Sequence, residues 1–178
     1  MGGFCFFTAI RIDINISDVS ISFLMSTFVS GFDYKMESSA IDKFKFKQQL
    51  QVRWMDLDPL AHVNNSIYIQ YFELGRGKYI SKASPSWDWH KNMFLIANIN
   101  CDYRHELTLT DSHPQVSVRV SRFGNKSFDL EYLITSEKNG GITIHAEGKS
   151  IQVMYDLKAK KSIAVPEWFK DELQAFES

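Results

Sequence analysis

The sequence predicts an α+β fold in which one long helix packs against an antiparallel sheet. Apolar residues recur at helical spacing from about residue 65 to residue 82, and strand-like alternation is found both before and repeatedly after this segment. Short turn sequences rich in glycine and asparagine link the later strands, as in antiparallel hairpins. With 178 residues, the chain is long enough to bury a core as one domain.

The first strand is expected between Phe44 and Trp54. Apolar residues alternate there with lysine, glutamine and arginine, which is the period of a half-buried strand. The alternation keeps one phase throughout, so this strand is expected to lead directly into the turn that contains Asp56 and Asp58.

The long helix is expected from about Asn65 to Lys82, with Asn64 or Asn65 as its N-cap. An apolar stripe at helical spacing is formed by Ile67, Tyr68, Tyr71, Phe72, Gly75 and Tyr79. Further apolar residues outside this stripe are Ile69, Leu74 and Ile80. So broad an apolar surface indicates a helix wrapped by a sheet.

Four strands are expected after the helix. Their alternating segments are Met93–Tyr103, Gln115–Val120, Phe128–Ile134 and Ile142–Tyr155. The turn at 139–141 and the segment 122–126 are expected to close hairpins. The apolar phase of the last strand shifts between Gly148 and Ile151, which predicts a bulge. Pro166 opens a short C-terminal helix with contacts expected from Trp168, Phe169 and Leu173.

Residues 1–36 are interpreted as an N-terminal extension and residues 37–178 as the domain. The extension is rich in Phe, Ile and Ser, and no clear period was found in it. Arg11 comes late for a secretory signal, and Asp13 and Asp18 interrupt the apolar runs. No run approaches the ~20 apolar residues of a membrane span. We therefore expect either a loosely packed extension or a start assigned too early, with Met36 as the natural first residue. Neither interpretation gives the segment a targeting role, and we expect no membrane partner.

The composition is that of an ordinary globular protein, with 44% apolar and 23% charged residues. A net charge of −1 argues against a nucleic-acid partner recognised through bulk positive charge. Cys5 and Cys101 have neither the spacing of metal ligands nor that of a disulfide framework. We therefore expect no metal site and a reduced, cytoplasmic location.

The stretch from Arg53 to Arg76 combines a turn rich in functional groups with the start of the helix. Asp56 and Asp58 are two residues apart, so they point the same way in an extended segment. Pro59 excludes a helical conformation for the residue before it. The pattern predicts a carboxylate on a rigid turn beside the positive end of a helix, which suits a reaction that develops an oxyanion.

This stretch resembles the signature of hotdog-fold acyl-thioesterases. The matching residues are Asp58-Pro59, His62-Val63-Asn64-Asn65, Tyr68, Glu73 and Arg76. Hydroxybenzoyl-CoA thioesterases and bacterial acyl-CoA thioester hydrolases share the pattern, plant acyl-ACP thioesterases carry a close relative, and a weaker likeness covers about residues 44–168. The resemblance implies a single hotdog domain, an acyl-CoA or acyl-ACP substrate and no cofactor. It also implies a homodimer or homotetramer with active sites at the subunit interface.

The resemblance assigns three residues to catalysis. Asp58 matches the family's catalytic carboxylate, which acts as general base or nucleophile, although an Asp before a helix can also simply form a turn. Asn65 matches the position whose backbone N–H polarises the thioester carbonyl. His62 matches the histidine of the plant enzymes, but Leu60 replaces their Asn two residues earlier, so a structural role for His62 stays open.

Four residues are expected to bind the substrate or CoA. Lys126 and Ser127 resemble a strand start in hydroxybenzoyl-CoA thioesterase, where adjacent basic residues contact the phosphates of CoA. Arg122 adds charge nearby, and Tyr68 belongs to the signature. The alternative for the first three is a solvated hairpin.

Two rival functions and one open question about the pocket remain. A hotdog dehydratase or hydratase would carry a His motif among Gly and Pro residues, which this sequence lacks. A non-catalytic acyl-CoA-binding protein is the other rival, although Asp58 argues against it. Trp87, Trp89 and Phe94 are candidates for the wall of an acyl pocket, and equally for the core.

Overall fold

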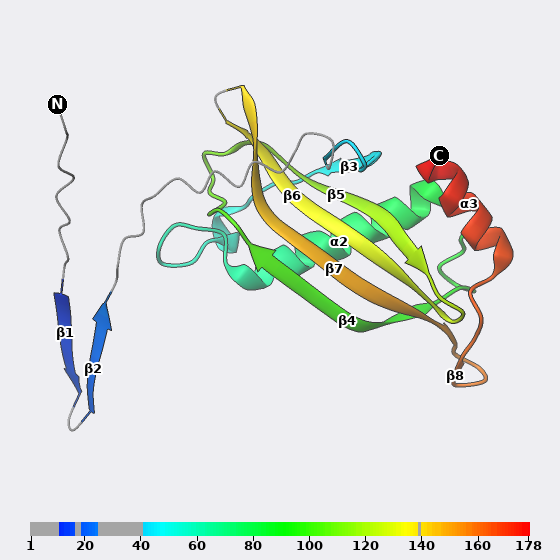
Figure 1. Ribbon diagram of the computed structural model, residues 1–178, viewed down its shortest axis with the longest axis horizontal. Helices are drawn as coiled ribbons and strands as arrows, with labels where there is room; N and C mark the ends of the chain where they lie inside the picture. Colours follow the sequence, from blue (N-terminus) through cyan, green and yellow to red (C-terminus); the bar gives the residue numbers. More distant parts are fainter. Residues whose placement is uncertain (1–10, 17–18, 25–40, 139) are drawn as a thin grey trace, which may run out of the picture. The chain divides into compact units, whose positions relative to one another are not determined.

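The computed structural model describes residues 11–16, 19–24, 41–138 and 140–178. The chain divides into two units, 1–35 and 36–178. In the first unit, β1 (Arg11–Ile16) pairs antiparallel with β2 (Val19–Leu24), as Figure 1 shows. This hairpin was not predicted from the sequence, although isoleucine stands at every second position of β1. The rest of the predicted extension lies outside the described residues.

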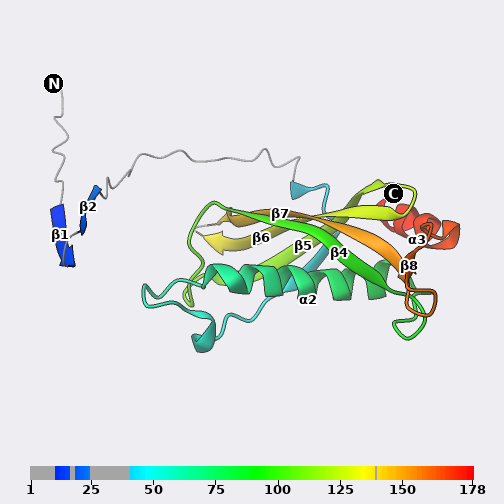
Figure 2. The ribbon, with the colours of Figure 1, turned by 90° about the horizontal axis from the view of Figure 1, so that it is seen from below.

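In the second unit, a curved antiparallel sheet covers one side of a single long helix, α2 (Asn65–Ala83), as Figure 2 shows. The strands in sheet order are β3 (Phe46–Gln49), β5 (Ser112–Phe123), β6 (Ser127–Lys138), β7 (Gly141–Asp156) and β4 (Phe94–Tyr103), with the short β8 (Lys161–Ser162) paired to β7. This is the hotdog arrangement, and it confirms the α+β fold predicted from the sequence.

The helix is held in the sheet by close packing along its buried face. Phe72, Tyr79 and Ile80 are fully buried in the main core. Gly75 lies so near Val116 and Val118 of β5 that a Cβ there would come within 2.9 Å of their methyl groups. The curved sheet therefore covers the helix face that carries the apolar stripe read from the sequence, while Leu74, which lies outside the stripe, is 43% exposed.

The first strand is shorter than predicted. β3 ends at Gln49, and after Leu50 the chain leaves the sheet and forms a single 3-10 turn, η1 (Trp54–Asp56). Trp54 is 76% exposed, so the alternation that was read as a strand does not continue into this turn. The reason is local, since Asp56 is buried and draws the backbone N–H and the side chain of Arg53 toward it.

The bulge predicted between Gly148 and Ile151 is wrong. β7 pairs with β6 without interruption there, and the register shifts instead between Ala146 and Ile144, which makes His145 the extra residue. The consequence is that Ser150 and Gln152 are buried with Tyr132, whose hydroxyl lies 2.6 Å from Ser150 Oγ. The sheet thus carries a polar network inside the core.

The C-terminal helix α3 (Glu167–Glu177) closes the end of the core that lies away from the start of α2. Phe169 and Leu173 are buried, and the Phe169 ring packs against Trp87 and Phe128. Trp87 therefore belongs to the core and lines no acyl pocket beside Asp58. None of the described helices is long and apolar enough to cross a membrane.

Candidate active site

The turn before α2 is anchored by a buried carboxylate, that of Asp56. It accepts hydrogen bonds from the Arg53 backbone N–H (2.8 Å), from the Arg53 guanidinium (2.8 Å) and from the Tyr71 hydroxyl (3.0 Å). Burial by itself raises the pKa of Asp56, but these donors outweigh it and hold the pKa below its usual value. Asp56 is thus a structural residue that ties the turn to α2.

Asp58 lies on the next part of the turn and is only partly buried. Its Oδ1 accepts from the backbone N–H groups of Leu60 (2.9 Å) and His62 (3.2 Å), while its own N–H donates to the His62 carbonyl (2.8 Å). Ala61 adopts a positive φ of 61° to close this turn. The other carboxylate oxygen, Oδ2, accepts no hydrogen bond from any described residue, so one oxygen holds the turn and one remains for a ligand.

The start of α2 presents backbone donors next to this turn. The side chain of Asn64 caps the helix by accepting from Ser66 N–H (3.0 Å), so Asn64 is the N-cap and Asn65 the first helical residue. The N–H of Asn65 finds no acceptor among the described residues. As the first N–H of a helix, it lies at the positive end of the helix dipole.

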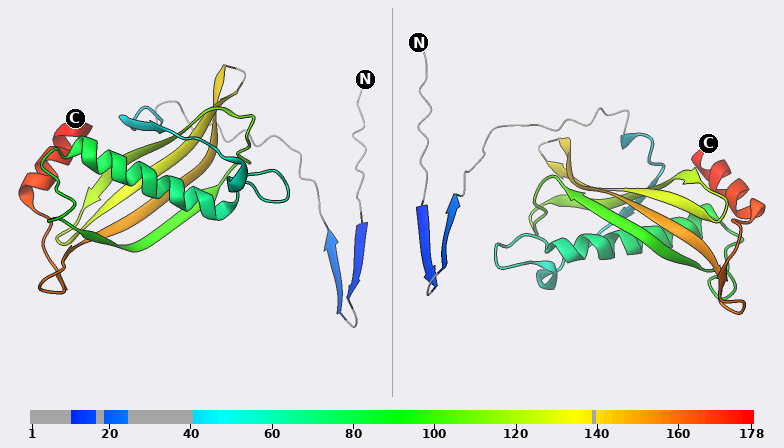
Figure 3. Two further views of the ribbon diagram at one scale, coloured as in Figure 1. Left: turned by 180° about the vertical axis from the view of Figure 1, so that it is seen from behind. Right: turned by 60° about the horizontal axis from the view of Figure 1, so that its bottom comes forward.

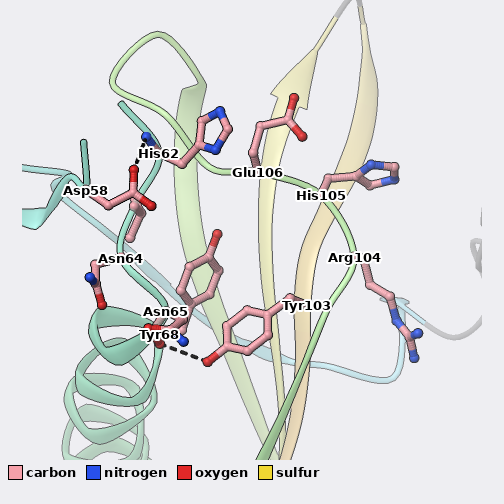
Figure 4. A pocket seen from close by; sticks show the side chains of 10 residues that line it. Asp58, His62, Asn64, Asn65, Tyr68, Tyr103, Arg104, His105 and Glu106 are labelled. Carbon is pink, nitrogen blue, oxygen red and sulfur yellow. Dashed lines mark hydrogen bonds between the residues drawn. The ribbon is translucent and has the colours of Figure 1, made fainter. Parts of the chain in front are cut away.

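A pocket of about 470 Å³ opens between this turn and the segment that follows β4. Figure 4 shows Asp58 and His62 on one side and the segment from Tyr103 to Glu106 on the other. The lining residues are Asp58, His62, Val63, Asn64, Asn65, Tyr68, Tyr103, Arg104, His105 and Glu106. The three predicted catalytic residues and Tyr68 therefore share one cavity.

Two aromatic side chains form the floor of this cavity. Tyr68 is buried and packs edge to face against Tyr103, with ring centroids 5.1 Å apart. Burial raises the pKa of Tyr68 to about 12, so its hydroxyl is protonated near neutral pH. The Tyr103 hydroxyl donates to the Asn65 carbonyl at 2.9 Å, which ties the end of β4 to the first turn of α2.

The far wall of the pocket, residues 103–106, was not predicted from the sequence. The run Arg104-His105-Glu106 directly after an alternating strand is a signal that could have identified it, because polar residues at strand ends often line sites. The wall is fixed to the site turn through a backbone hydrogen bond from Val63 N–H to the Leu107 carbonyl at 2.7 Å. Leu107 itself is fully buried.

Lys126, Ser127 and Arg122 do not line this pocket. They belong to the β5–β6 hairpin at the opposite end of the sheet, as the left view of Figure 3 shows. Tyr103 of the pocket pairs with Ala146 of β7, whereas Ser127 pairs with Val153, so seven residues of β7, roughly 23 Å, separate the pocket from the hairpin along the sheet. Arg122 is paired with Asp129 (2.9 Å) and Lys126 Nζ lies 3.5 Å from Ser162 Oγ. Within one chain, these residues therefore lie outside the pocket that contains Asp58.

The described residues contain no group of three or more His, Cys, Asp and Glu side chains placed to hold a metal ion. The pocket is lined instead by the carboxylates of Asp58 and Glu106, the imidazoles of His62 and His105, and a helix N-terminus. Such a set can move a proton and stabilise an oxyanion.

Comparison with known proteins gives three sequence relationships. A family model described as the thioesterase-like superfamily matches residues 52–173. The chain is 30% identical over 129 residues to the long-chain acyl-CoA thioesterase FadM of Escherichia coli, which covers 71% of this chain and 95% of that protein. It is 29% identical over 90 residues to the protein YsmA of Bacillus subtilis, which covers 51% of this chain and 60% of that protein.

Solved structures with a similar fold also include thioesterases. A Thermus thermophilus thioesterase in complex with coenzyme A and Zn aligns with a TM-score of 0.66 and 31% identity, covering 76% of this chain and 96% of that one. A variant of 4-hydroxybenzoyl-CoA thioesterase bound to 4-hydroxybenzoyl-CoA aligns with a TM-score of 0.66 over 72% of this chain and 97% of that one. At 15% identity, the second likeness concerns the fold alone.

Proposed function

Because the chain belongs to the thioesterase-like superfamily and is a thioester hydrolase, we propose that it hydrolyses acyl-CoA thioesters with Asp58 as the catalytic carboxylate. The observation that carries this proposal is that the two carboxylate oxygens of Asp58 differ in their hydrogen bonding. Oδ1 holds the turn, while Oδ2 is left without a partner among the described residues, beside the start of α2.

The proposed reaction places the thioester carbonyl at the helix start. The Asn65 N–H donates to the carbonyl oxygen, where negative charge develops as the carbon becomes tetrahedral. Asp58 Oδ2 takes a proton from a water molecule that attacks this carbon, or attacks it directly to give an anhydride that water then opens. The C–S bond breaks, and the leaving thiolate takes up a proton as the free thiol.

His62 is the candidate for assisting these proton transfers. Its imidazole lines the same pocket, and neither ring nitrogen bonds to a described residue. The backbone N–H of His62, by contrast, supports Asp58 Oδ1. We assign the backbone of His62 to the positioning of Asp58 and its side chain to proton transfer. Leu60 stands where the plant enzymes have Asn, which argues against a mechanism centred on His62 alone.

The proposed substrate class rests on two relatives with 30% and 31% sequence identity. FadM is a long-chain acyl-CoA thioesterase, and the Thermus structure contains coenzyme A. A CoA ester is therefore favoured over an acyl carrier protein, which remains the second possibility for the leaving group.

A homodimer would complete this site. Among the described strands, β4 pairs only with β7, so its outer edge is open. Large exposed apolar side chains on the site turn and on β4 are Trp54, Met55, Leu60, Leu95, Ile96 and Tyr103. We propose that two β4 edges pair antiparallel about a two-fold axis, which removes the open edge and covers these side chains.

Such a dimer also gives the β5–β6 hairpin a role. In an antiparallel pair, the start of one β4 lies beside the end of the other, where the pocket is. Ser127 pairs with Val153, which pairs with Leu95 near the start of β4, so the hairpin is two strands, roughly 10 Å, from the shared edge. Lys126 of the partner subunit would then reach the CoA phosphates.

A panel of acyl-CoAs of different length and aromaticity tests the proposed function. Free-thiol release is followed together with absorbance changes of the acyl double bond, and matched acyl-carrier-protein esters are included. Thiol release from at least one CoA ester is the expected result. Double-bond chemistry without thiol release would favour the hydratase rival, and tight binding without turnover would favour the non-catalytic one.

A further inference from the structure

His145 is an unusual residue for the position that it occupies. It is the extra residue at the β7 bulge, since Ile134 of β6 pairs with Ala146 and Thr135 pairs with Ile144. Only 1% of its surface is exposed. Bulges turn a side chain away from the regular alternation of a strand, and they are common beside active sites.

Both ring nitrogens of His145 are used. Nδ1 lies 2.8 Å from the Glu106 carbonyl oxygen, and Nε2 lies 2.7 Å from Ser136 Oγ. A carbonyl oxygen only accepts, so Nδ1 carries the proton, and Nε2 of the neutral ring accepts from the Ser136 hydroxyl. Every polar atom of this buried ring is satisfied.

The backbone of His145 serves the same segment. Its carbonyl oxygen accepts from the N–H groups of Arg104 (2.8 Å) and His105 (3.3 Å), directly after the last paired residue of β4. One bulged residue therefore holds three consecutive residues of the pocket wall. The carbonyl of the next residue, Leu107, accepts from Val63 N–H, so the wall is hydrogen-bonded to His145 at one end and to the turn before α2 at the other.

An aliphatic side chain would fill this buried space without the cost of desolvating an imidazole. The ring is instead directed at the wall that faces Asp58. We propose that His145 is a positioning residue for thioester hydrolysis, whose Nδ1–H bond to the Glu106 carbonyl fixes residues 104–106 as the substrate-contacting wall of the pocket. This inference rests on the proposed function, because it assumes that the pocket binds the acyl-CoA.

Two amide substitutions separate the two ring nitrogens. In His145→Asn the side-chain N–H₂ takes the place of Nδ1 and can still donate to Glu106. In His145→Gln the amide reaches only the place of Nε2 and keeps the bond to Ser136. Loss of the hydrogen bond to the Glu106 carbonyl weakens the binding of substrate and transition state alike. His145→Gln should therefore raise KM by about five- to tenfold and keep kcat within about threefold of the natural protein. His145→Asn should keep both KM and kcat within about threefold of the values of the natural protein.

Hydrogen exchange provides a readout that does not depend on activity. Amides of residues 104–107 should exchange faster in His145→Gln than in His145→Asn, while those of α2 stay protected in both. Ser136→Ala serves as a control, since it keeps the Nδ1–H bond and should leave KM unchanged within about twofold.

Equal behaviour of the Asn and Gln variants, or failure of both to fold, would overturn the inference, because His145 would then serve the core alone. If the natural protein releases no thiol from any acyl-CoA, the proposed function fails, yet the exchange data still decide whether Nδ1–H holds the wall.

Discussion

The ring of Phe72 lies in the space that a Cβ on Gly148 would occupy. The Asn100 carbonyl oxygen closes the same space at 2.9 Å from the ideal Cβ position. Phe72 also stacks on Tyr132, with ring centroids 4.5 Å apart. Helix α2 can approach β7 this closely only because residue 148 has no side chain, just as Gly75 permits its close approach to β5.

Gly148→Ala should therefore lower the free energy of unfolding by about 1–3 kcal/mol, the usual cost of overpacking a core. Gly77→Ala is the matched control, because nothing lies within 4 Å of its ideal Cβ. In a helix interior this change should raise stability by about 0.5–1 kcal/mol. Urea unfolding of both variants measures the difference, and equal stability of the two would contradict the packing described here.

The sequence could predict the element order because each element carries its own period. The boundaries of α2, for example, follow from Asn64 as a cap and from the apolar residues between Ile67 and Tyr79. Bulge positions could not be read in this way. Ser150 and Gln152 are polar but buried, so the apparent change of phase near them reflects a polar network in the core and no extra residue.

The side of the candidate site that is formed by the turn and the start of α2 could be predicted from local sequence spacing. Asp58, His62 and Asn65 belong to one turn and the helix start that follows it, so short-range spacing brings them together. His105 and Glu106 lie beside these residues only because β4 pairs with β7 and because the bulge at His145 binds the segment that follows β4. Such contacts depend on strand register, which one sequence does not reveal when the core face of a strand is partly polar.

Stability should depend on the protonation of His145. Burial lowers the pKa of this imidazole, although the nearby Asp111 carboxylate and the hydrogen-bonded backbone of Glu106 and His105 act in the opposite direction. In the unfolded chain the pKa is about 6.5. The unfolded state therefore binds more protons as pH falls below about 6.5, so the contribution to stability is present above this pH and is lost as pH falls toward the lower folded pKa.

Urea unfolding at about pH 7.5 and about pH 5.5 measures this effect. The natural protein should lose more stability between the two pH values than His145→Asn, which has no imidazole at this position. The other histidines are common to both proteins and cancel in the comparison. The same loss in both proteins would show that His145 does not titrate in this range.

The proposed dimer makes a prediction about β4. Ile96→Lys places a charge on the open edge strand and should shift the protein toward monomer, with a fall in kcat/KM of roughly tenfold or more because the site loses its partner. Ile142→Lys, on the β6–β7 hairpin, is a control at another exposed isoleucine and should leave the dimer intact. Sedimentation analysis gives the oligomeric state, and a dimer that tolerates Ile96→Lys would exclude β4 as the interface.

Removal of residues 1–35 should leave a folded and active protein. The core clusters, the sheet from β3 to β8 and every residue of the pocket lie in the second unit. Thermal unfolding, sedimentation and thiol release are compared with the full chain. Insolubility or a changed oligomeric state of the shortened protein would assign the extension to the core or to the interface.

Thiol release by Asp58→Asn tests whether Asp58 is the catalytic carboxylate. The amide oxygen still accepts from Leu60 and His62 N–H, so the turn should persist, while the charge and basicity on Oδ2 are lost. Asp171→Asn on the exposed side of α3 is the matched control and should keep full activity. Turnover of acyl-CoA by Asp58→Asn should fall by ~10²–10⁴-fold with binding retained. Near-full turnover in a folded variant would contradict the assignment of Asp58.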